Sequence, residues 1–171
     1  MESRWMRTIP HEVKSKFVAR RYMDDILMWY AQSESWDHKK LISDFEESKC
    51  YDKPLKLEDG GDGTFLETSY EVKHGRIRYW LKNQNAGGEK NVWRYQHFDS
   101  YASYAQKRAT LKACLVKVQK MASDRDAVEQ SGWDKVQEFV DLGYPRAMLK
   151  SLCNLMGART RERGWFEIRD A

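Results

Sequence analysis

Two short apolar stretches early in the chain enclose a polar dipeptide. Residues 17–22 and 26–30 are rich in aromatic and aliphatic side chains, and Met23, Asp24 and Asp25 lie between them. Strand-forming residues on both sides of a short polar turn predict a β-hairpin. The tip of this hairpin would carry two adjacent carboxylates.

The pattern becomes helical in residues 35–49. Leu41, Ile42 and Phe45 form one apolar stripe, and charged residues fill most of the remaining positions. Ser35 is suited to the N-cap because its hydroxyl can accept a hydrogen bond from the first helical turn. We therefore expect one amphipathic helix after the hairpin.

Residues 54–81 return to a strand pattern that glycine interrupts. Glycines between residues 60 and 63 mark one turn, and His74-Gly75 marks a second. Apolar positions alternate on both sides of the second turn, which predicts another hairpin. Residues 82–99 lack this periodicity and are expected to form a linker or an irregular loop.

The chain beyond residue 90 has the pattern of three amphipathic helices. The apolar stripe of the first is formed by Leu111, Cys114, Leu115, Val118, Met121 and Ala122. The apolar faces of the other two contain Trp133, Val136, Phe139, Val140, Leu149, Leu152, Leu155 and Met156. We expect the second helix from about Asp126 to Gly143. The third is expected from Pro145 to Gly157, because proline suits a first turn and glycine a helix end.

These elements predict an α+β fold in two parts. Residues 1–90 would hold the two hairpins and the first helix. Residues 91–171 would form a small three-helix bundle. The last part of the chain, residues 159–171, is expected to fray.

Composition favours a folded domain with a modest core. Leu, Ile, Val and Phe make up 32 of the 171 residues, a share close to that of disordered chains. The net charge of +4 is too small to drive expansion, and seven Trp, nine Tyr and seven Met replace part of the missing aliphatic bulk. No apolar run is long enough to cross a membrane, so no membrane partner is expected.

The cysteines and histidines show no metal-binding or disulfide pattern. Cys50, Cys114 and Cys153 are odd in number and widely spaced, which favours a reducing compartment. We therefore expect an intracellular protein of the cytoplasm or nucleus. The four histidines stand apart from one another and are expected to be solvated or hydrogen-bonded.

The adjacent carboxylates of Asp24 and Asp25 are the sharpest chemical feature. A bare Asp-Asp pair is most often a solvated turn. Here Tyr22 and Met23 precede the pair, and apolar strands flank it, which a surface turn does not need. Such a pair is suited to bind a hard divalent cation, because Mg²⁺ is usually bound by one or two carboxylates together with substrate phosphates.

At this point the chain resembles the reverse transcriptases. The resemblance rests on the motifs YMDD at residues 22–25, FLE at 65–67, SYAQKR at 103–108 and LGYP at 142–145. The first, with ARR before it and ILM after it, is similar to the catalytic aspartate box. The second occupies the place of the primer-grip hairpin, and the last two resemble the thumb of the non-retroviral and Penelope-like enzymes. The match covers most of residues 16–155.

The resemblance implies a partial polymerase palm followed by a thumb. Asp24 would bind the catalytic metals, Mg²⁺ or Mn²⁺, and Asp25 would support the site and contact metal less directly. The remaining matched positions would contact primer or template, and they are Tyr22, Met23, Phe65, Leu66, Glu67, Lys107, Arg108, Lys112, Lys117 and Lys120. The implied partners of the intact enzyme are an RNA template, a DNA primer and a dNTP.

Charge is distributed as this resemblance requires. Residues 91–123 carry six Lys and Arg against one Asp, whereas residues 37–62 carry five Lys against eight acids. A charge run alone is usually a solvated helix face. Concentrated on the thumb-like part, the positive charge would bind the phosphates of a template–primer duplex.

The chain also departs from the family pattern. Enzymes of this type need a further metal-binding aspartate on an earlier palm strand and a fingers region, and only 23 residues precede Asp24. The acidic cluster of Glu58, Asp59 and Asp62 lacks calcium-loop spacing and is no substitute. We therefore expect a fragment that binds metal weakly and does not polymerise alone, unless a missing N-terminal half completes it.

Two other functions fit the same residues. A remnant of a retroelement polymerase would keep the basic helices and bind nucleic acid or protein without catalysis. A small metal-dependent nuclease would use Asp24 and Asp25, although nothing near the pair resembles a general base.

Overall fold

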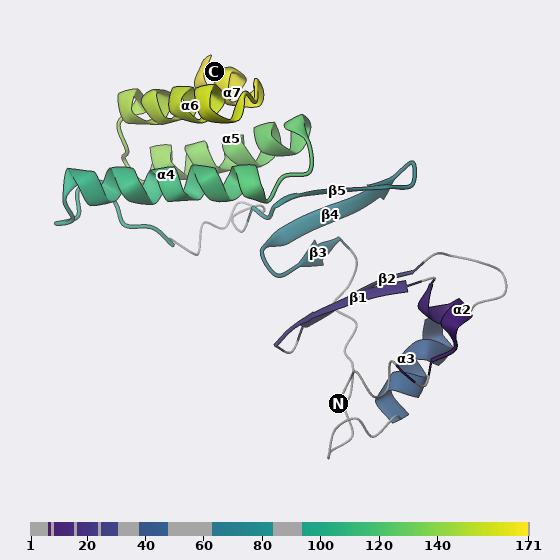
Figure 1. Cartoon of the computed structure of the whole chain (residues 1–171). Helices are drawn as coiled ribbons and strands as arrows, with labels where there is room; N and C mark the ends of the chain where they lie inside the picture. The colour runs from purple at the N-terminus through teal and green to yellow at the C-terminus, as the bar shows by residue number, and fades with distance from the viewer. Residues whose placement is uncertain are drawn as a thin grey trace. The chain divides into compact units, whose positions relative to one another are not determined.

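The chain has an α+β fold built from small antiparallel sheets and helices, as predicted (Figure 1). The structure is a computed structural model that describes residues 7, 9–15, 17–23, 25–30, 38–47, 63–83 and 94–170. The chain divides into two compact units, Met1–Asp62 and Gly63–Ala171.

The first unit contains the predicted hairpin. Strands β1 (Phe17–Tyr22) and β2 (Asp25–Tyr30) pair antiparallel, with Phe17 opposite Tyr30 and Tyr22 opposite Asp25. A short helix α2 (His11–Lys14) precedes the hairpin, and α3 (His38–Glu47) follows it. The predicted helix of residues 35–49 is thus confirmed over its middle part, and Ser35 lies outside the described residues.

The second unit begins with a three-stranded sheet in the order β3 (Thr64–Phe65), β4 (Thr68–Lys73) and β5 (Arg76–Leu81). The predicted hairpin at His74-Gly75 is confirmed, since both residues have positive φ angles, 50° and 72°, and Val72 pairs with Ile77. Two such angles in a two-residue loop match the twist of the flanking strands.

Helix α4 (Tyr104–Lys120) follows, and its start is set by local sequence. The Ser103 hydroxyl accepts a hydrogen bond from the backbone N–H of Gln106, and the Gln106 side chain accepts one from the Ser103 N–H. This reciprocal pair is a capping box, which satisfies two N–H groups that the helix leaves unpaired.

The second unit continues with helix α5 (Arg125–Asp141) and helix α6 (Arg146–Thr160). These two helices run in opposite directions (Figure 1). Asp124 caps α5 by accepting a hydrogen bond from the Ala127 N–H at 2.9 Å. Gly143 ends this region with a φ of 80°, and Pro145 is the N-cap of α6. The predicted breaks at these two residues are confirmed.

Two predictions for the C-terminal part are wrong. Gly157 does not end the third helix, because α6 continues to Thr160 and ends at Arg161, whose φ is 58°. The expected frayed tail instead forms helix α7 (Gly164–Asp170), so four helices replace the expected three in this part of the described chain. Gly157 is buried inside α6, where an added Cβ would lie 2.7 Å from the Phe166 ring.

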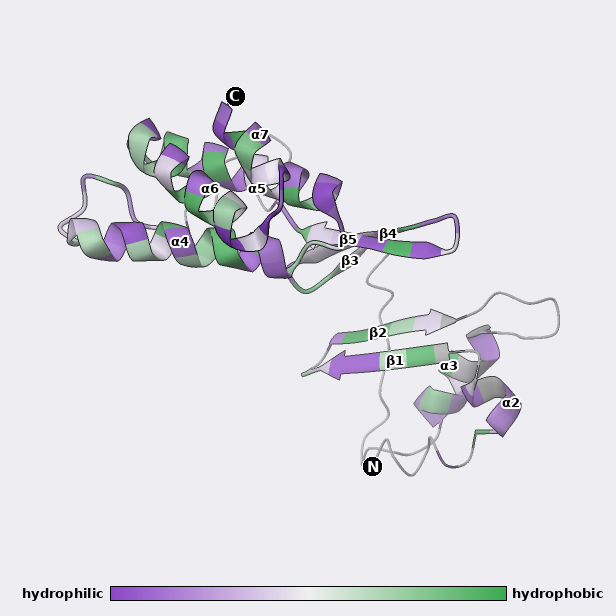
Figure 2. Ribbon diagram, turned by 45° about the horizontal axis from the view of Figure 1, so that its top comes forward, coloured by the Kyte–Doolittle hydropathy of each residue, from purple (hydrophilic) through white to green (hydrophobic). Residues whose placement is uncertain are grey.

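The core of the second unit explains why α7 is ordered. Trp165 is fully buried and Ile168 nearly so, and both pack in the same cluster as Leu111, Phe139 and Leu152. Figure 2 shows hydrophobic and hydrophilic positions side by side on α4, α5 and α6, as amphipathic helices require. Two residues predicted for apolar faces, Trp133 and Leu155, are 39% and 40% exposed instead.

The boundary between the two units lies at residues 62–63, whereas the sequence predicts a boundary between palm and thumb near residue 90. The physical reason is packing, since β5 contacts both α4 and α5, and Leu81 belongs to the helical core. Residues 94–99 are irregular, as expected, but Tyr95 and Phe98 pack against that core. Palm and thumb as functional divisions stay predictions.

In the described part of the chain, no helix is both long enough and apolar enough to cross a bilayer.

Candidate nucleic-acid interface

The tip of the β1–β2 hairpin presents three of the predicted site residues to solvent. Tyr22 is 56% exposed and Met23 is 74% exposed, and Asp25 is exposed as the first residue of β2. Met23 has a φ of 52°, and its carbonyl accepts a hydrogen bond from the Arg21 Nε at 2.5 Å. Asp24 lies outside the described residues.

One face of this hairpin mixes exposed apolar side chains with charged ones, because Arg20 and Asp25 share it with three exposed apolar residues. Val18 and Trp29 are cross-strand partners, and Tyr22 lies on the same face because alternate strand residues share a face. All three side chains are exposed. A two-stranded hairpin is marginally stable on its own, so a face of this kind suits a larger sheet or a packed partner.

The metal chemistry of the tip rests on carboxylate oxygens. Asp25 offers an exposed carboxylate, the ligand type that Mg²⁺ prefers. Among the described residues, no group of three or more His, Cys, Asp or Glu is placed to hold a metal ion. Metal binding by the Asp24 and Asp25 pair stays a prediction, since Asp24 lies outside the described residues.

The FLE motif forms the turn between β3 and β4. Phe65 pairs with Thr68, and Leu66 and Glu67 make the two-residue connection. Leu66 has a φ of 54° and an exposed side chain. The backbone carbonyl of Glu67 accepts a hydrogen bond from the Lys82 N–H at 2.7 Å, which fixes the turn against the end of β5.

The Glu67 side chain joins this turn to the basic helix. Its carboxylate forms ion pairs with Lys117 of α4 and, at 2.7 Å, with Arg94. The hydrogen bond from Lys117 is the main cause that lowers the pKa of Glu67, with Arg94 adding to it and partial burial opposing it. Two predicted site residues, Glu67 and Lys117, therefore lie together.

Arg94 is a member of this group that the sequence did not indicate. It lies in the segment read as an irregular linker, where no periodicity or motif distinguishes it. Only the path of residues 94–99 beside α4 and the sheet brings its guanidinium to Glu67. Residues 94–99 have the irregular structure predicted for this segment, and they also bring Arg94 to the sheet.

The cations of α4 divide into exposed and engaged groups. Arg108 and Lys120 are exposed and Lys112 is half-buried, so these three can meet a polyanion along the helix. Lys117 is half-buried and engaged by Glu67. Phosphate binding by Arg108, Lys112 and Lys120 stays a prediction. Lys117 would contact a phosphate only while its ammonium is also bound to the Glu67 carboxylate.

Lys107 differs from the other cations of α4 because it is buried, with 7% of its surface exposed. Its ammonium donates a hydrogen bond to the Ser100 carbonyl at 2.7 Å and lies 5.0 Å from the centre of the Phe98 ring. These contacts give Lys107 a structural role at the start of α4. The expected contact between this side chain and phosphate has no support from its position.

The LGYP motif packs the segment before α4 onto the helices. Tyr144 is buried and makes edge-to-face contacts with Phe98 and Phe139, at centroid distances of 5.2 and 4.8 Å. The Phe98 N–H donates to the Leu142 carbonyl at 2.8 Å. At Gly143 an added Cβ would lie 3.2 Å from the His97 ring. The glycine of the motif therefore lets the His97 side chain pack close to the backbone.

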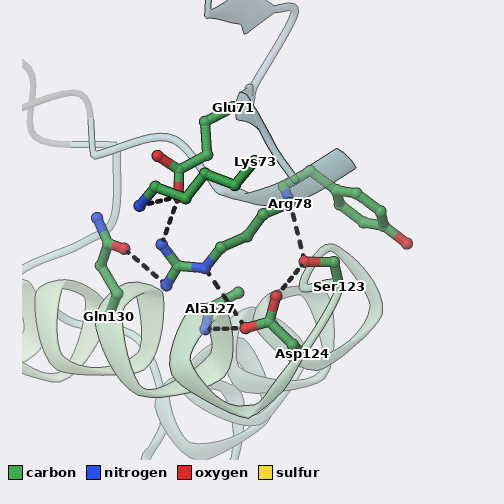
Figure 3. A network of polar contacts seen from close by, with 8 residues as sticks. Glu71, Lys73, Arg78, Ser123, Asp124, Ala127 and Gln130 are labelled. Carbon is green, nitrogen blue, oxygen red and sulfur yellow. Dashed lines mark hydrogen bonds and ion pairs between the residues drawn. The ribbon is translucent and has the colours of Figure 1, made fainter. Parts of the chain in front are cut away.

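A second polar network, drawn in Figure 3, fastens the β4–β5 hairpin to the start of α5. Arg78 donates to Glu71 at 3.1 Å, to Gln130 at 3.4 Å and to the capping residue Asp124 at 3.5 Å. The Tyr79 N–H donates to the Ser123 hydroxyl at 3.0 Å. Sequence reasoning identified none of these partners, and the network holds the sheet rather than forming an open site.

The Glu67 group and the Arg78 network therefore attach one small sheet to both α4 and α5. This positions the exposed Leu66 turn beside the cationic helix within the second unit. Comparison of the chain with protein-family models, with curated proteins and with solved structures finds no match.

Proposed function

We propose that the chain is the palm and thumb portion of a reverse transcriptase from a non-retroviral retroelement. In the intact enzyme, RNA-templated DNA synthesis would proceed by attack of the primer 3′ hydroxyl on the α-phosphate of a dNTP. The described residues would serve primer positioning and duplex binding, and the chain alone would be inactive.

The observation that carries this proposal is the ion pair between Glu67 and Lys117. It joins the two motifs that the resemblance assigns to primer contact, the FLE turn and the basic helix. Leu66 is exposed at this turn, and Arg108 and Lys120 are exposed on the helix. A turn held against a cationic helix is suited to keep a primer end and a duplex backbone in register.

The hairpin tip supports the catalytic half of the proposal. Asp25 is exposed and adjoins Asp24 in the sequence, and Tyr22 and Met23 are exposed beside it. Asp24 and Asp25 would hold Mg²⁺ or Mn²⁺ together with an aspartate of another palm strand. The metal would supply activation of the primer hydroxyl and charge neutralisation at the phosphate.

The exposed side chains of Val18 and Tyr22 support the same proposal, because further sheet or a partner chain would cover them in an intact palm. An intracellular setting, cytoplasm or nucleus, is part of the same proposal, because template, primer and dNTP are found there.

The test is an Asp24→Asn change in a complex reconstituted with a segment that supplies the missing palm strands and fingers. The variant should lose DNA synthesis on a primed RNA template and keep the wild-type affinity for the duplex. Asp44→Asn, a change of an exposed acid on α3, is the matched control and should leave both unchanged. Synthesis that survives Asp24→Asn would overturn the proposal.

A non-catalytic remnant is the second candidate. It is favoured by the exposed cations Arg108 and Lys120 of α4, which can bind a phosphate backbone without a metal. This remnant would bind duplex through α4 and show no synthesis in any reconstituted complex. Wild-type protein that binds duplex with high affinity, yet never extends a primer, would identify it.

A further inference from the structure

A pocket on the helical part of the second unit is separate from the α4 surface. It has a volume of about 100 Å³ and is lined only by residues of α5, α6 and α7. Trp133, which is 39% exposed, forms part of its wall. The proposed reverse transcriptase function makes no use of this pocket.

The floor of the pocket is aliphatic. Val136, Leu149 and Ile168 line it and are themselves buried, and Val140 lies beside them. A pocket of this size is smaller than the cavity of about 150 Å³ that takes up benzene, so it suits one aliphatic side chain better than an aromatic ring. Burial of such a side chain stabilises a complex through the area removed from water.

The rim of the pocket is cationic. Arg146, Lys150 and Arg169 line it, and no Asp or Glu does. Arg169 is neutralised by Asp170 at 2.6 Å, and Lys150 interacts with the same carboxylate at longer range. Within the described ranges, neither Arg146 nor Lys150 forms a direct ion pair. The two lie four positions apart on α6, where like charges repel, and the first turn of α6 has no acid.

We propose that this pocket docks an acidic peptide segment of a partner protein. One aliphatic side chain, such as Leu, would enter between Trp133 and the aliphatic floor. Asp or Glu residues on either side of it would pair with Arg146 and Lys150. The complementarity of charge relieves the repulsion between these two cations and steers association.

A nucleobase suits the pocket less well than an apolar side chain. A base carries polar edges that must find partners when they are buried. The one amide in the lining, Gln137, already donates from its Nε2 to Asp141 at 2.9 Å, and the floor offers no hydrogen-bonding group. The observations therefore favour protein over single-stranded nucleic acid as the occupant.

The test uses the whole chain and fluorescence anisotropy of a short labelled peptide with Asp and Glu on both sides of one central Leu. A peptide with Ser in place of the Leu is the first control. The Leu peptide should bind, and the Ser peptide should bind about tenfold or more weakly because the apolar anchor is lost. Equal affinity of both peptides would overturn the proposal, since a diffuse cationic patch would then suffice.

Charge-reversal variants locate the site. Arg146→Glu with Lys150→Glu should weaken peptide binding about tenfold or more, because both changed positions lie at the rim. Arg108→Glu with Lys120→Glu changes net charge equally on the exposed face of α4 and should leave peptide binding unchanged. All four side chains are exposed, and matching circular dichroism spectra would exclude misfolding as a cause.

The same variants separate this inference from the proposed function. The α4 pair should lower affinity for a primed RNA duplex, and the α6 pair should not. Oligo(dT) of matched charge that competes with the Leu peptide, and loses binding with the α6 pair, would overturn the peptide assignment in favour of nucleic acid. Failure of duplex binding with intact peptide binding would overturn only the proposed function.

Discussion

The Glu67 carboxylate accepts a hydrogen bond from the Lys117 ammonium, although 50 positions separate the two residues in the chain. Arg94 binds the same carboxylate from a third segment. Through this contact a two-residue turn of a small sheet is fixed to the last turn of a cationic helix. The geometry of the proposed primer-contacting surface depends on it.

Removing this contact should lower stability by a modest amount. Glu67→Gln, Lys117→Met and the double variant form a double-mutant cycle, and the coupling energy should be about 0.5–1 kcal/mol because both side chains are partly exposed. Urea unfolding at neutral pH measures it. A coupling energy of zero would show that the ion pair does not hold the turn.

The same contact should depend on pH. The pKa of Glu67 is lowered in the folded state by Lys117, so its contribution is present above the unfolded pKa and is lost as pH falls through the folded pKa. The stability difference between wild type and Glu67→Gln should therefore shrink below about pH 4. A difference that stays constant down to pH 2 would contradict this assignment.

The last helix should contribute strongly to stability. Trp165 is fully buried, so Trp165→Ala should lower the free energy of unfolding by about 3–5 kcal/mol. Trp133→Ala, which removes an identical but 39% exposed side chain from α5, is the matched control and should cost about 1 kcal/mol or less. Equal losses for the two variants would mean that α7 does not pack as described.

Gly132 provides a sharper test of how α7 packs on α5. A Cβ at this position would lie 2.4 Å from the Ile168 Cδ1 and 3.3 Å from the Trp165 ring, so Gly132→Ala should cost about 1–3 kcal/mol by overpacking. Adding Ile168→Val removes the closest atom and should restore part of the loss. Thermal unfolding of the single and double variants checks this, and a neutral Gly132→Ala would contradict it.

Lys107 and Arg108 should have different roles despite their adjacency. Lys107→Met removes the hydrogen bond to the Ser100 carbonyl and should lower stability by about 1–2 kcal/mol. Arg108→Met should leave stability unchanged and reduce the salt slope of duplex binding by about one. Unfolding curves and binding across a salt series separate the two, and an unchanged slope for Arg108→Met would count against the thumb assignment.

Cys153 should be inert in the folded protein. It is buried beneath the α5–α6–α7 pocket, and burial raises its pKa to about 11. Because the thiolate is the reactive form, a thiol reagent at pH 8 should label Cys153 only in denaturant. Variants that keep Cys153 as the single cysteine allow the labelling rate to be followed by absorbance, and rapid labelling without denaturant would contradict the burial.

The elements predicted from local signals are the ones whose causes are local. The β1–β2 hairpin follows from strand-forming residues around a short turn, and the capping box at Ser103 and the break at Gly143 involve neighbours in the chain. Their partners are near in sequence, so pattern and spacing suffice. The same holds for exposure of Tyr22, Met23 and Asp25 at a turn.

The elements that sequence reasoning missed have distant partners. Residues 159–171 have no strong helix signal at their start, and α7 is stabilised by burial of Trp165 and Ile168 against α5. Gly157 looked like a helix end, but its missing side chain makes room for Phe166. Lys107 has the sequence pattern of a surface cation, but the segment that contains Phe98 covers it in the structure.

The sequence by itself determined an α+β chain, its two hairpins, the start of α4 and the motif order on which the proposed polymerase function rests. These depend on turn chemistry, capping and periodicity, which act over a few residues. Tertiary structure alone decided which cations are free, that Arg94 joins Glu67, and that a fourth helix closes the core. Those outcomes depend on burial and pairing between segments far apart in the chain, and local pattern does not encode them.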